Sequence, residues 1–241
     1  MMRNELLLLA SLVLAYGGAL IWLRLFGKSG LYGWTILATI AANIEVTLLV
    51  NAFGMEQTLG NVLFASTFLA TDILSECYGK KAAQKAVYLG VAASFFFILI
   101  SQSWLLYTPS PNDVMAGPLR TVFSNTPRMM LVSLAVYAVA QHFDVWLYHK
   151  WWAFTQRRCG DSRRFLWLRN NGSTLFSQLL NTILFTLGAF WGSYSWGTLL
   201  SLMASSYVIF IFTSLADTPA VYLARSIAAG RADGRAAKRG E

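Results

Sequence analysis

The chain has 241 residues, of which 56% are hydrophobic and 12% are charged. Soluble globular domains carry about 25% charged residues, so this composition excludes an ordinary soluble domain and indicates an integral membrane protein. The formal net charge of +8 invites a nucleic-acid-binding function. The placement of the basic residues, described below, argues against that function.

Seven apolar segments are long enough to cross about 30 Å of hydrocarbon, which takes about 20 helical residues. The chain is therefore predicted to be all-α, a polytopic membrane helical bundle with a six-helix core and one extra N-terminal helix. We expect one transmembrane domain over 1–225 and a basic, disordered tail over 226–241. The predicted spans lie near 5–26, 31–53, 58–78, 82–106, 127–149, 172–192 and 197–223.

The first segment resembles a signal peptide in position only. Its apolar run is longer than the roughly 7–15 residues of a signal-peptide core, and it has no convincing small-residue cleavage site. Its basic flank, Arg24 and Lys28, follows the run instead of preceding it. We therefore expect a retained helix.

Basic residues gather on one side of the predicted bundle. Only Arg3, Arg120 and Arg128 fall on the other side. Positive loops face the cytoplasm, so this split predicts an external N-terminus and a cytoplasmic C-terminus in the inner (cytoplasmic) membrane. The basic residues on the cytoplasmic side are Arg24, Lys28, Lys80, Lys81, Lys85, Lys150, Arg157, Arg158, Arg163, Arg164, Arg169, Arg225, Arg231, Arg235, Lys238 and Arg239.

Two carboxylates, Asp72 and Glu76, stand one helical turn apart inside the third predicted span. The i, i+4 spacing places both on one helix face. A charged group in hydrocarbon costs about 2.5–3.5 kcal/mol on insertion scales, so such groups face protein or a water-filled cavity. The pair is therefore expected to hold a polar ligand, a proton or a structural partner.

Other spans also carry polar residues at helical spacing. Half of such residues are expected only to bind helices together. Asp144 and Asp217 lie toward cytoplasmic helix ends, where pairing with a nearby lysine or arginine is an equally good interpretation. The polar candidates outside the third span are Asn43, Gln141, Asp144, Gln178, Asn181 and Asp217.

Catalytic and metal-binding signatures are absent from the sequence. There is no GxSxG, HExxH or P-loop motif, and no Cys/His spacing typical of a metal site. We expect no catalytic residues, no metal and no cofactor, and therefore a protein that is not an enzyme.

Four segments carry a family resemblance. They are ATDILSECYGKKAAQKAV after the third span, AVAQHFDVWLYHK in the fifth, WLRNNGSTLFSQLLNT entering the sixth and ADTPAVYLAR ending the seventh. Together they resemble the queuosine-precursor transporters, also called the vitamin-uptake transporter family. That family is similar in fold to the substrate-binding subunits of energy-coupling-factor transporters. The resemblance covers roughly 31–225.

The resemblance implies uptake of a 7-deazaguanine base, either the cyano or aminomethyl precursor of queuosine or queuine itself, for salvage into tRNA. A carboxylate can accept the paired N–H groups of a guanine-like edge, and an amide can donate to its ring oxygen. Arg169 and Asp217 are expected to form a gate or an ion pair. The residues expected to bind substrate are Asn43, Asp72, Glu76, Gln141, Asp144, Gln178 and Asn181.

This sequence departs from the family pattern at two positions. An aspartate usually stands at the position of Asn181, and a lysine commonly stands near Tyr207, where this chain has Phe210. The two changes either compensate each other as a lost ion pair or alter the preferred charge of the precursor. The sequence leaves both interpretations open.

Three functional hypotheses follow. The first is a precursor transporter that works without an energising partner in the same chain. The second is a membrane binding subunit that depends on an ATPase and a scaffold. The third, an intramembrane enzyme, would change its substrate chemically. The expected partners are a small deazapurine base and the lipid bilayer, with no nucleic acid, and a homo-oligomer remains open.

Overall fold

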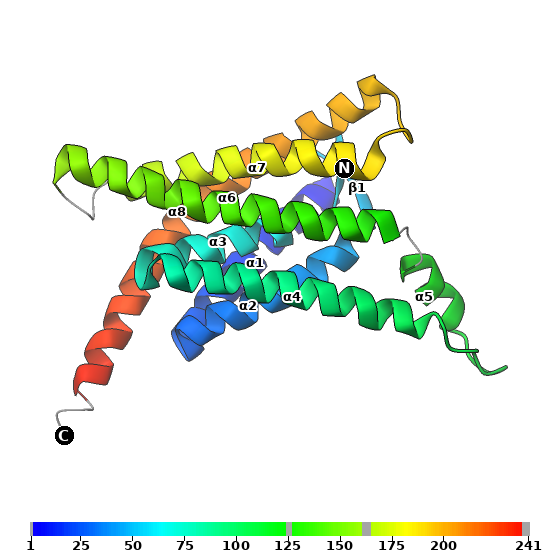
Figure 1. Ribbon diagram of the computed structural model, residues 1–241, viewed down its shortest axis with the longest axis horizontal. Helices are drawn as coiled ribbons and strands as arrows, with labels where there is room; N and C mark the ends of the chain where they lie inside the picture. The colour runs from blue at the N-terminus through cyan, green and yellow to red at the C-terminus, as the bar shows by residue number, and fades with distance from the viewer. Residues whose placement is uncertain (1, 124–126, 161–164, 238–241) are drawn as a thin grey trace.

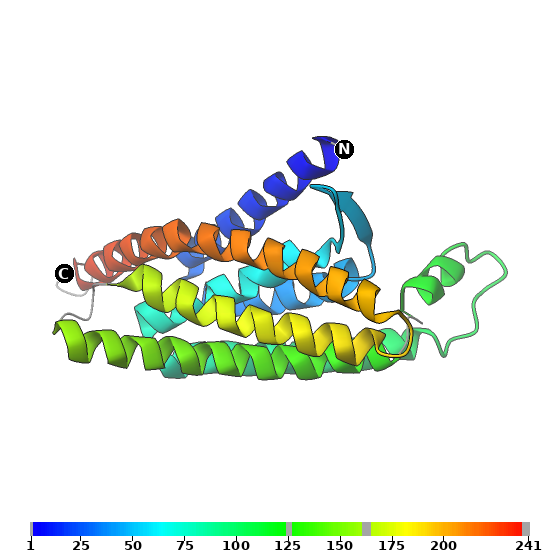
Figure 2. The same ribbon diagram turned by 90° about the horizontal axis from the view of Figure 1, so that it is seen from above.

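The computed structural model describes residues 2–123, 127–160 and 165–237. In this part of the chain, seven long helices, one short helix and a two-stranded hairpin form one elongated bundle (Figures 1 and 2). The all-α fold prediction is confirmed. The elements are α1 (Met2–Phe26), α2 (Lys28–Glu45), β1 (Leu49–Ala52), β2 (Met55–Thr58), α3 (Gly60–Tyr78), α4 (Lys80–Trp104), α5 (Ala116–Phe123), α6 (Pro127–Cys159), α7 (Leu166–Phe190) and α8 (Trp196–Ala237).

Five of these helices are long and apolar enough to cross a membrane by length and composition. They correspond to α1, α4, α6, α7 and α8. The other two predicted spans correspond to α2 and α3, which have 18 and 19 residues and are the shortest of the seven long helices. Helix α3 packs against α1, α2, α4, α6 and α8, and most of its side chains are buried. A helix enclosed by other helices meets little lipid, so it can carry polar side chains that a lipid-facing helix cannot.

The N-terminal helix α1 is an integral part of the bundle. Its Ala19 and Leu23 are fully buried, and the helix packs against α2, α3 and α8. Gly30 of α2 lies directly against the backbone carbonyl of Trp22, where a side chain would collide. This close approach fixes α1 beside the start of α2.

The second predicted span, 31–53, is wrong in its last third. Helix α2 ends at Glu45, and the following apolar run forms strand β1, which pairs antiparallel with β2. Strand β1 includes Val50, and β-branched residues favour strands. Phe53 and Gly54 form the turn with φ of 53° and 73°, the positive values that a two-residue hairpin turn requires.

The segment between the fourth and fifth predicted spans contains helix α5, and residues 124–126 lie outside the described part of the chain. Helix α8 continues to Ala237, so the prediction of a disordered tail is wrong for 226–237. Alanine and arginine are good helix formers, which favours continuation. Residues 238–241 lie outside the described part.

Candidate functional site

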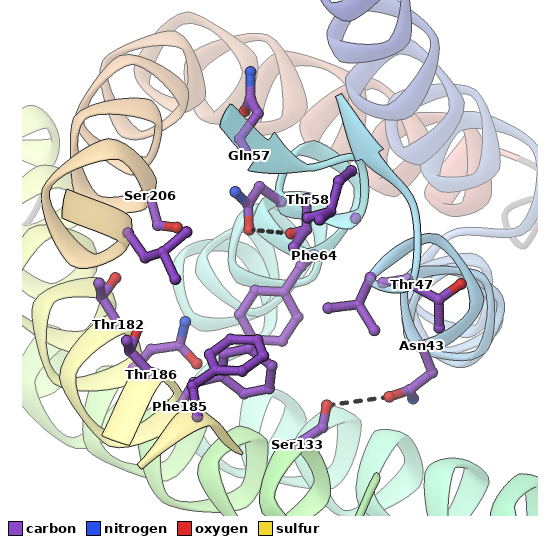
Figure 3. A pocket seen from close by; sticks show the side chains of 18 of the residues that line it. Asn43, Thr47, Gln57, Thr58, Phe64, Ser133, Thr182, Phe185, Thr186 and Ser206 are labelled. Atoms are coloured by element: carbon purple, nitrogen blue, oxygen red, sulfur yellow. Dashed lines mark hydrogen bonds between the residues drawn. The ribbon is translucent and has the colours of Figure 1, made fainter. Parts of the chain in front are cut away.

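A cavity of about 360 Å³ opens between α2, α3, α6, α7, α8 and the hairpin. Small-molecule sites typically have volumes of about 300–1,000 Å³, so this cavity suits a compact ligand. Figure 3 shows Asn43 of α2 and Ser133 of α6 on one side of it, with Thr182, Thr186 and Ser206 of α7 and α8 on another. The site therefore draws on segments far apart in the sequence.

Aromatic rings form one wall of the cavity. Phe64 projects from the first turns of α3 toward Phe185 of α7 (Figure 3). The ring centroid of Phe64 is 5.9 Å from that of Tyr137 and 6.3 Å from that of Phe210. Clustered rings of this kind present flat faces and edges to a planar ligand.

One amide in the cavity is already engaged by protein. Asn43 donates to the Thr39 carbonyl at 2.9 Å and contacts Ser94 Oγ at 3.3 Å. Its oxygen accepts a hydrogen bond from Ser133 at 3.1 Å. Asn43 therefore joins α2, α4 and α6, and any contact with a ligand would come in addition to this structural role.

Other polar groups in the cavity have no hydrogen-bond partner among the described residues. They are Nδ2 of Asn61 and the hydroxyl of Thr182. The amide atoms of Gln57 also have no partner among the described residues, but its side chain points away from the aromatic rings (Figure 3). Leaving a buried polar group unsatisfied costs about 1–3 kcal/mol. A polar ligand could satisfy these groups, and they combine donors with acceptors.

The carboxylate among the lining residues is Glu56 on strand β2, which is exposed. Among the lining residues that the structure describes there is no lysine, arginine or histidine. Asn181 and Phe210, the two departures from the family pattern, both line this cavity. The cavity interior is therefore predominantly neutral and aromatic.

A buried polar layer includes most of the acidic and amide candidates. Thr174 of α7 donates to Asp72 Oδ2 at 3.0 Å, and Ser177 donates to Asp144 Oδ1 at 2.7 Å. The carboxyl groups of Asp72 and Asp144 lie beside each other. Gln178 on the same helix is fully buried, and neither of its amide atoms has a partner among the described residues.

Gln141 completes this layer. Its amide nitrogen donates to Thr67 Oγ1 at 2.7 Å, and its oxygen accepts from Thr71 Oγ1 at 3.2 Å. Gln141 therefore ties α6 to α3 through side-chain hydrogen bonds. Neither Gln141 nor the residues Asp72, Asp144 and Gln178 line the cavity.

Glu76 belongs to a buried ion pair. Arg169 donates to its two oxygens through Nε and Nη2 at 2.7–3.0 Å, and Tyr148 donates at 2.9 Å. Arg225 approaches the same carboxylate at 3.6 Å. The guanidinium of Arg169 also lies 4.4 Å from the ring centroid of Trp152. This group joins α3, α6, α7 and α8 near the predicted cytoplasmic ends.

Asp217 is buried in α8, away from the cavity lining. The Tyr16 hydroxyl from α1 lies beside it and donates to the Thr213 carbonyl at 3.1 Å. Asp217 is thus placed against the N-terminal helix.

The geometry separates the predicted site residues into groups. Asn43 and Asn181 line the cavity, whereas Asp72, Gln141, Asp144 and Gln178 form the buried layer. Glu76 pairs with Arg169. Substrate binding by these residues remains a prediction. Among the described residues, no group of His, Cys, Asp and Glu could hold a metal ion.

Sequence reasoning missed the hairpin residues of the cavity. The predicted spans leave Glu56 and Gln57 between the second and third spans and place Asn61 at the start of the third. A polar cluster next to Gly54, between two apolar runs, was the available signal. This signal is weak, because the turn is formed by Phe53-Gly54 and the dipeptide that most often indicates a two-residue hairpin turn is Asn-Gly.

Comparisons with known proteins agree on one family. Residues 58–224 match the family described as "Putative vitamin uptake transporter". The chain is 39% identical over 208 residues to "Probable queuosine precursor transporter" of Bacillus subtilis (strain 168), covering 86% of this chain and 89% of the relative. The chain belongs to the queuosine-precursor transporter family.

A second relative is more distant. The chain is 29% identical over 175 residues to "Queuosine precursor transporter" of Escherichia coli (strain K12), covering 73% of this chain and 70% of the relative. No solved structure matches the chain. Membership of the queuosine-precursor transporter family, together with five apolar helices, establishes a multi-pass membrane protein.

Proposed function

We propose that this chain takes up queuosine precursors, 7-deazaguanine bases, across the cytoplasmic membrane for salvage into tRNA. The observation that carries the proposal is the cavity of about 360 Å³, which combines aromatic rings with unsatisfied amide and hydroxyl groups. A deazaguanine base is flat, and its edge has both donors and acceptors. The names of the two relatives support the same substrate class.

Each part of the cavity has a role in this proposal. The ring of Phe64, with Tyr137 and Phe210 beside it, packs against the flat base. Glu56 accepts the paired N–H groups of the guanine-like edge, and the Asn61 amide donates to the ring oxygen. The carboxylate that sequence reasoning sought in Asp72 is thus supplied by the hairpin.

The neutral interior favours an uncharged precursor. An amide at Asn181 both donates and accepts, whereas an ionised aspartate only accepts. A cationic aminomethyl group would have no carboxylate at this position, and hydrogen bonds to charged groups are stronger than those between neutral groups. We therefore propose the cyano precursor as the preferred substrate.

The ion pair of Glu76 with Arg169 is proposed as the inner closure of the pathway. It crosslinks four helices near the end where basic residues accumulate. The same charge pattern supports an external N-terminus and a cytoplasmic C-terminus. The hairpin side of the cavity then faces outward.

Complementation tests the proposal. The chain is expressed alone in a strain that lacks precursor synthesis and uptake, and queuosine in its tRNA is measured after feeding with the cyano precursor. Restored queuosine supports the proposal. No restoration by correctly inserted protein contradicts autonomous uptake, and restoration only with an ATPase and scaffold supports the binding-subunit alternative.

A further inference from the structure

Part of the cavity lining lies on the hairpin, which is not part of any helix of the bundle. Its residues Leu49, Glu56, Gln57 and Thr58 are among those that line the cavity, and Figure 3 shows Gln57 and Thr58 on strand β2. An isolated two-stranded hairpin is only marginally stable in water. Something else in the molecule must therefore hold these residues in place.

The first turns of α1 supply polar attachment points. Asn4 Nδ2 donates to the Asn51 carbonyl at 2.9 Å. Glu5 Oε1 accepts from the Phe53 backbone N–H at 3.1 Å, within the turn itself. Phe53 has φ of 53°, a conformation that a bulky residue rarely adopts. The Glu5 contact therefore fixes the hairpin at its most unusual residue.

A small apolar cluster adds a third attachment. Ala52 of β1 is 1% exposed and packs with Leu8 of α1 and Val62 of α3. Helix α1 thus holds the hairpin by one hydrogen bond at the turn, one at Asn51 of β1 and one small apolar contact. Strand β2 packs in addition against α8.

Other contacts act at the opposite end of the hairpin. The Leu59 amide donates to the Leu48 carbonyl at 2.8 Å. Thr58 donates to Asn61 at 3.1 Å, which ties β2 to the start of α3. The strand ends are therefore fixed to the bundle, whereas the turn depends on α1. This arrangement defines a flap with its hinge at Leu48 and Leu59 and its latch at Asn4 and Glu5.

We propose that Asn4 and Glu5 are positioning residues that latch the hairpin as an outer lid over the substrate cavity. The latch holds Glu56 and Gln57 at the cavity and opens to admit the base. The proposal rests on the proposed function for what enters, but the lid itself can be tested without substrate.

The substrate-free test measures access to the cavity. Ser206→Cys, at a residue that lines the cavity, is introduced into a chain whose two native cysteines are replaced by serine. It is reacted with a small maleimide in three backgrounds: wild type, Glu5→Ala and Glu5→Gln. Glutamine keeps an oxygen that accepts from Phe53, so it is the matched control. Losing one hydrogen bond is expected to speed labelling about fivefold in Glu5→Ala and to leave Glu5→Gln near wild type. Equal labelling rates in all three backgrounds would overturn the latch.

A transport test asks whether the lid must open. Asn4→Cys/Asn51→Cys is crosslinked with a short reducible dithiol-specific reagent, and uptake of the cyano precursor is measured before and after reduction. The lid predicts uptake at least about tenfold slower by the crosslinked double variant than by the same variant untreated, with full recovery on reduction. The reagent itself is expected to leave uptake by either single-cysteine variant unchanged. Unchanged uptake by the crosslinked protein would overturn the gating role.

The two failures are distinguishable. Wild type that accumulates no precursor contradicts the proposed function, while the labelling experiment still decides the latch. Loss of folded protein is monitored separately by size-exclusion chromatography in detergent, and labelling rates are taken only from the monodisperse fraction.

Discussion

Removing Arg169 is expected to destabilise the protein through the charge that remains. The side chain of Arg169 is 0% exposed and that of Glu76 is 4% exposed, so neither charge can turn to water. Breaking a buried, hydrogen-bonded ion pair by removing one partner costs about 3–5 kcal/mol. Arg225 lies 3.6 Å from Glu76 and partly neutralises its charge. We therefore expect Arg169→Met to lower the free energy of unfolding by about 3 kcal/mol, the lower end of that range.

A double substitution separates lost pairing from lost packing. Arg169→Met/Glu76→Leu removes both charges and keeps much of the volume. Replacing both members of a buried pair by apolar residues is often neutral or stabilising. The double variant should therefore lie within about 1 kcal/mol of wild type, so that the second change rescues the first.

The melting midpoints of both variants are measured by thermal unfolding of the purified proteins in detergent. For a chain of this size, about 3 kcal/mol corresponds to a fall in melting midpoint of roughly 6–12 °C. Arg169→Lys keeps the charge but loses the two-pronged geometry, so an intermediate midpoint is expected. A single variant as stable as wild type, or a double variant less stable than the single, would contradict the destabilisation expected from an unpaired, buried Glu76.

Three further predictions concern transport and packing. Asn181→Asp should shift preference from the cyano to the aminomethyl precursor by about tenfold in competition assays, because the aspartate gains a charge-assisted hydrogen bond to the aminomethyl group. A uniform loss of uptake for both precursors would show that Asn181 is part of the scaffold. Asp72→Asn should impair uptake more than Asp217→Asn at matched expression, because Asp72 lies in the polar layer beside Asp144, and equal uptake would contradict this. Gly90→Ala should cost about 1–3 kcal/mol in melting experiments, because the added carbon meets the hydroxyl of Tyr137; an unchanged midpoint would show that this ring moves freely.

The sequence predicts the bundle well because lipid imposes a simple rule on it. Each helix must be long and apolar enough to cross the membrane, and these properties are local. The i, i+4 spacing of Asp72 and Glu76 likewise predicts a shared helix face. Their different partners, Thr174 and Arg169, come from another helix, so spacing within α3 could not identify them.

The hairpin shows where prediction from neighbouring residues in the sequence fails. The run from Val46 to Ala52 is mostly apolar, with only Thr47 and Asn51 polar, so composition alone extends α2. Strand pairing depends on partners across a turn, and here also on Asn4 and Glu5, nearly fifty residues away. Cavity residues on the hairpin were missed for this reason. Asn181 could be singled out because it shares a helical face with other polar residues, and it lines the cavity; its role in binding stays a prediction.

Flux through the purified chain decides whether the chain transports the precursor on its own. The protein alone is reconstituted into liposomes, without ATPase or scaffold, and entry of radiolabelled cyano precursor is measured against protein-free vesicles. The account predicts saturable entry that unlabelled precursor competes away and that Phe64→Ala weakens by removing the central ring of the cavity wall. Entry no faster than in protein-free vesicles, with protein shown to be folded and inserted, would contradict it.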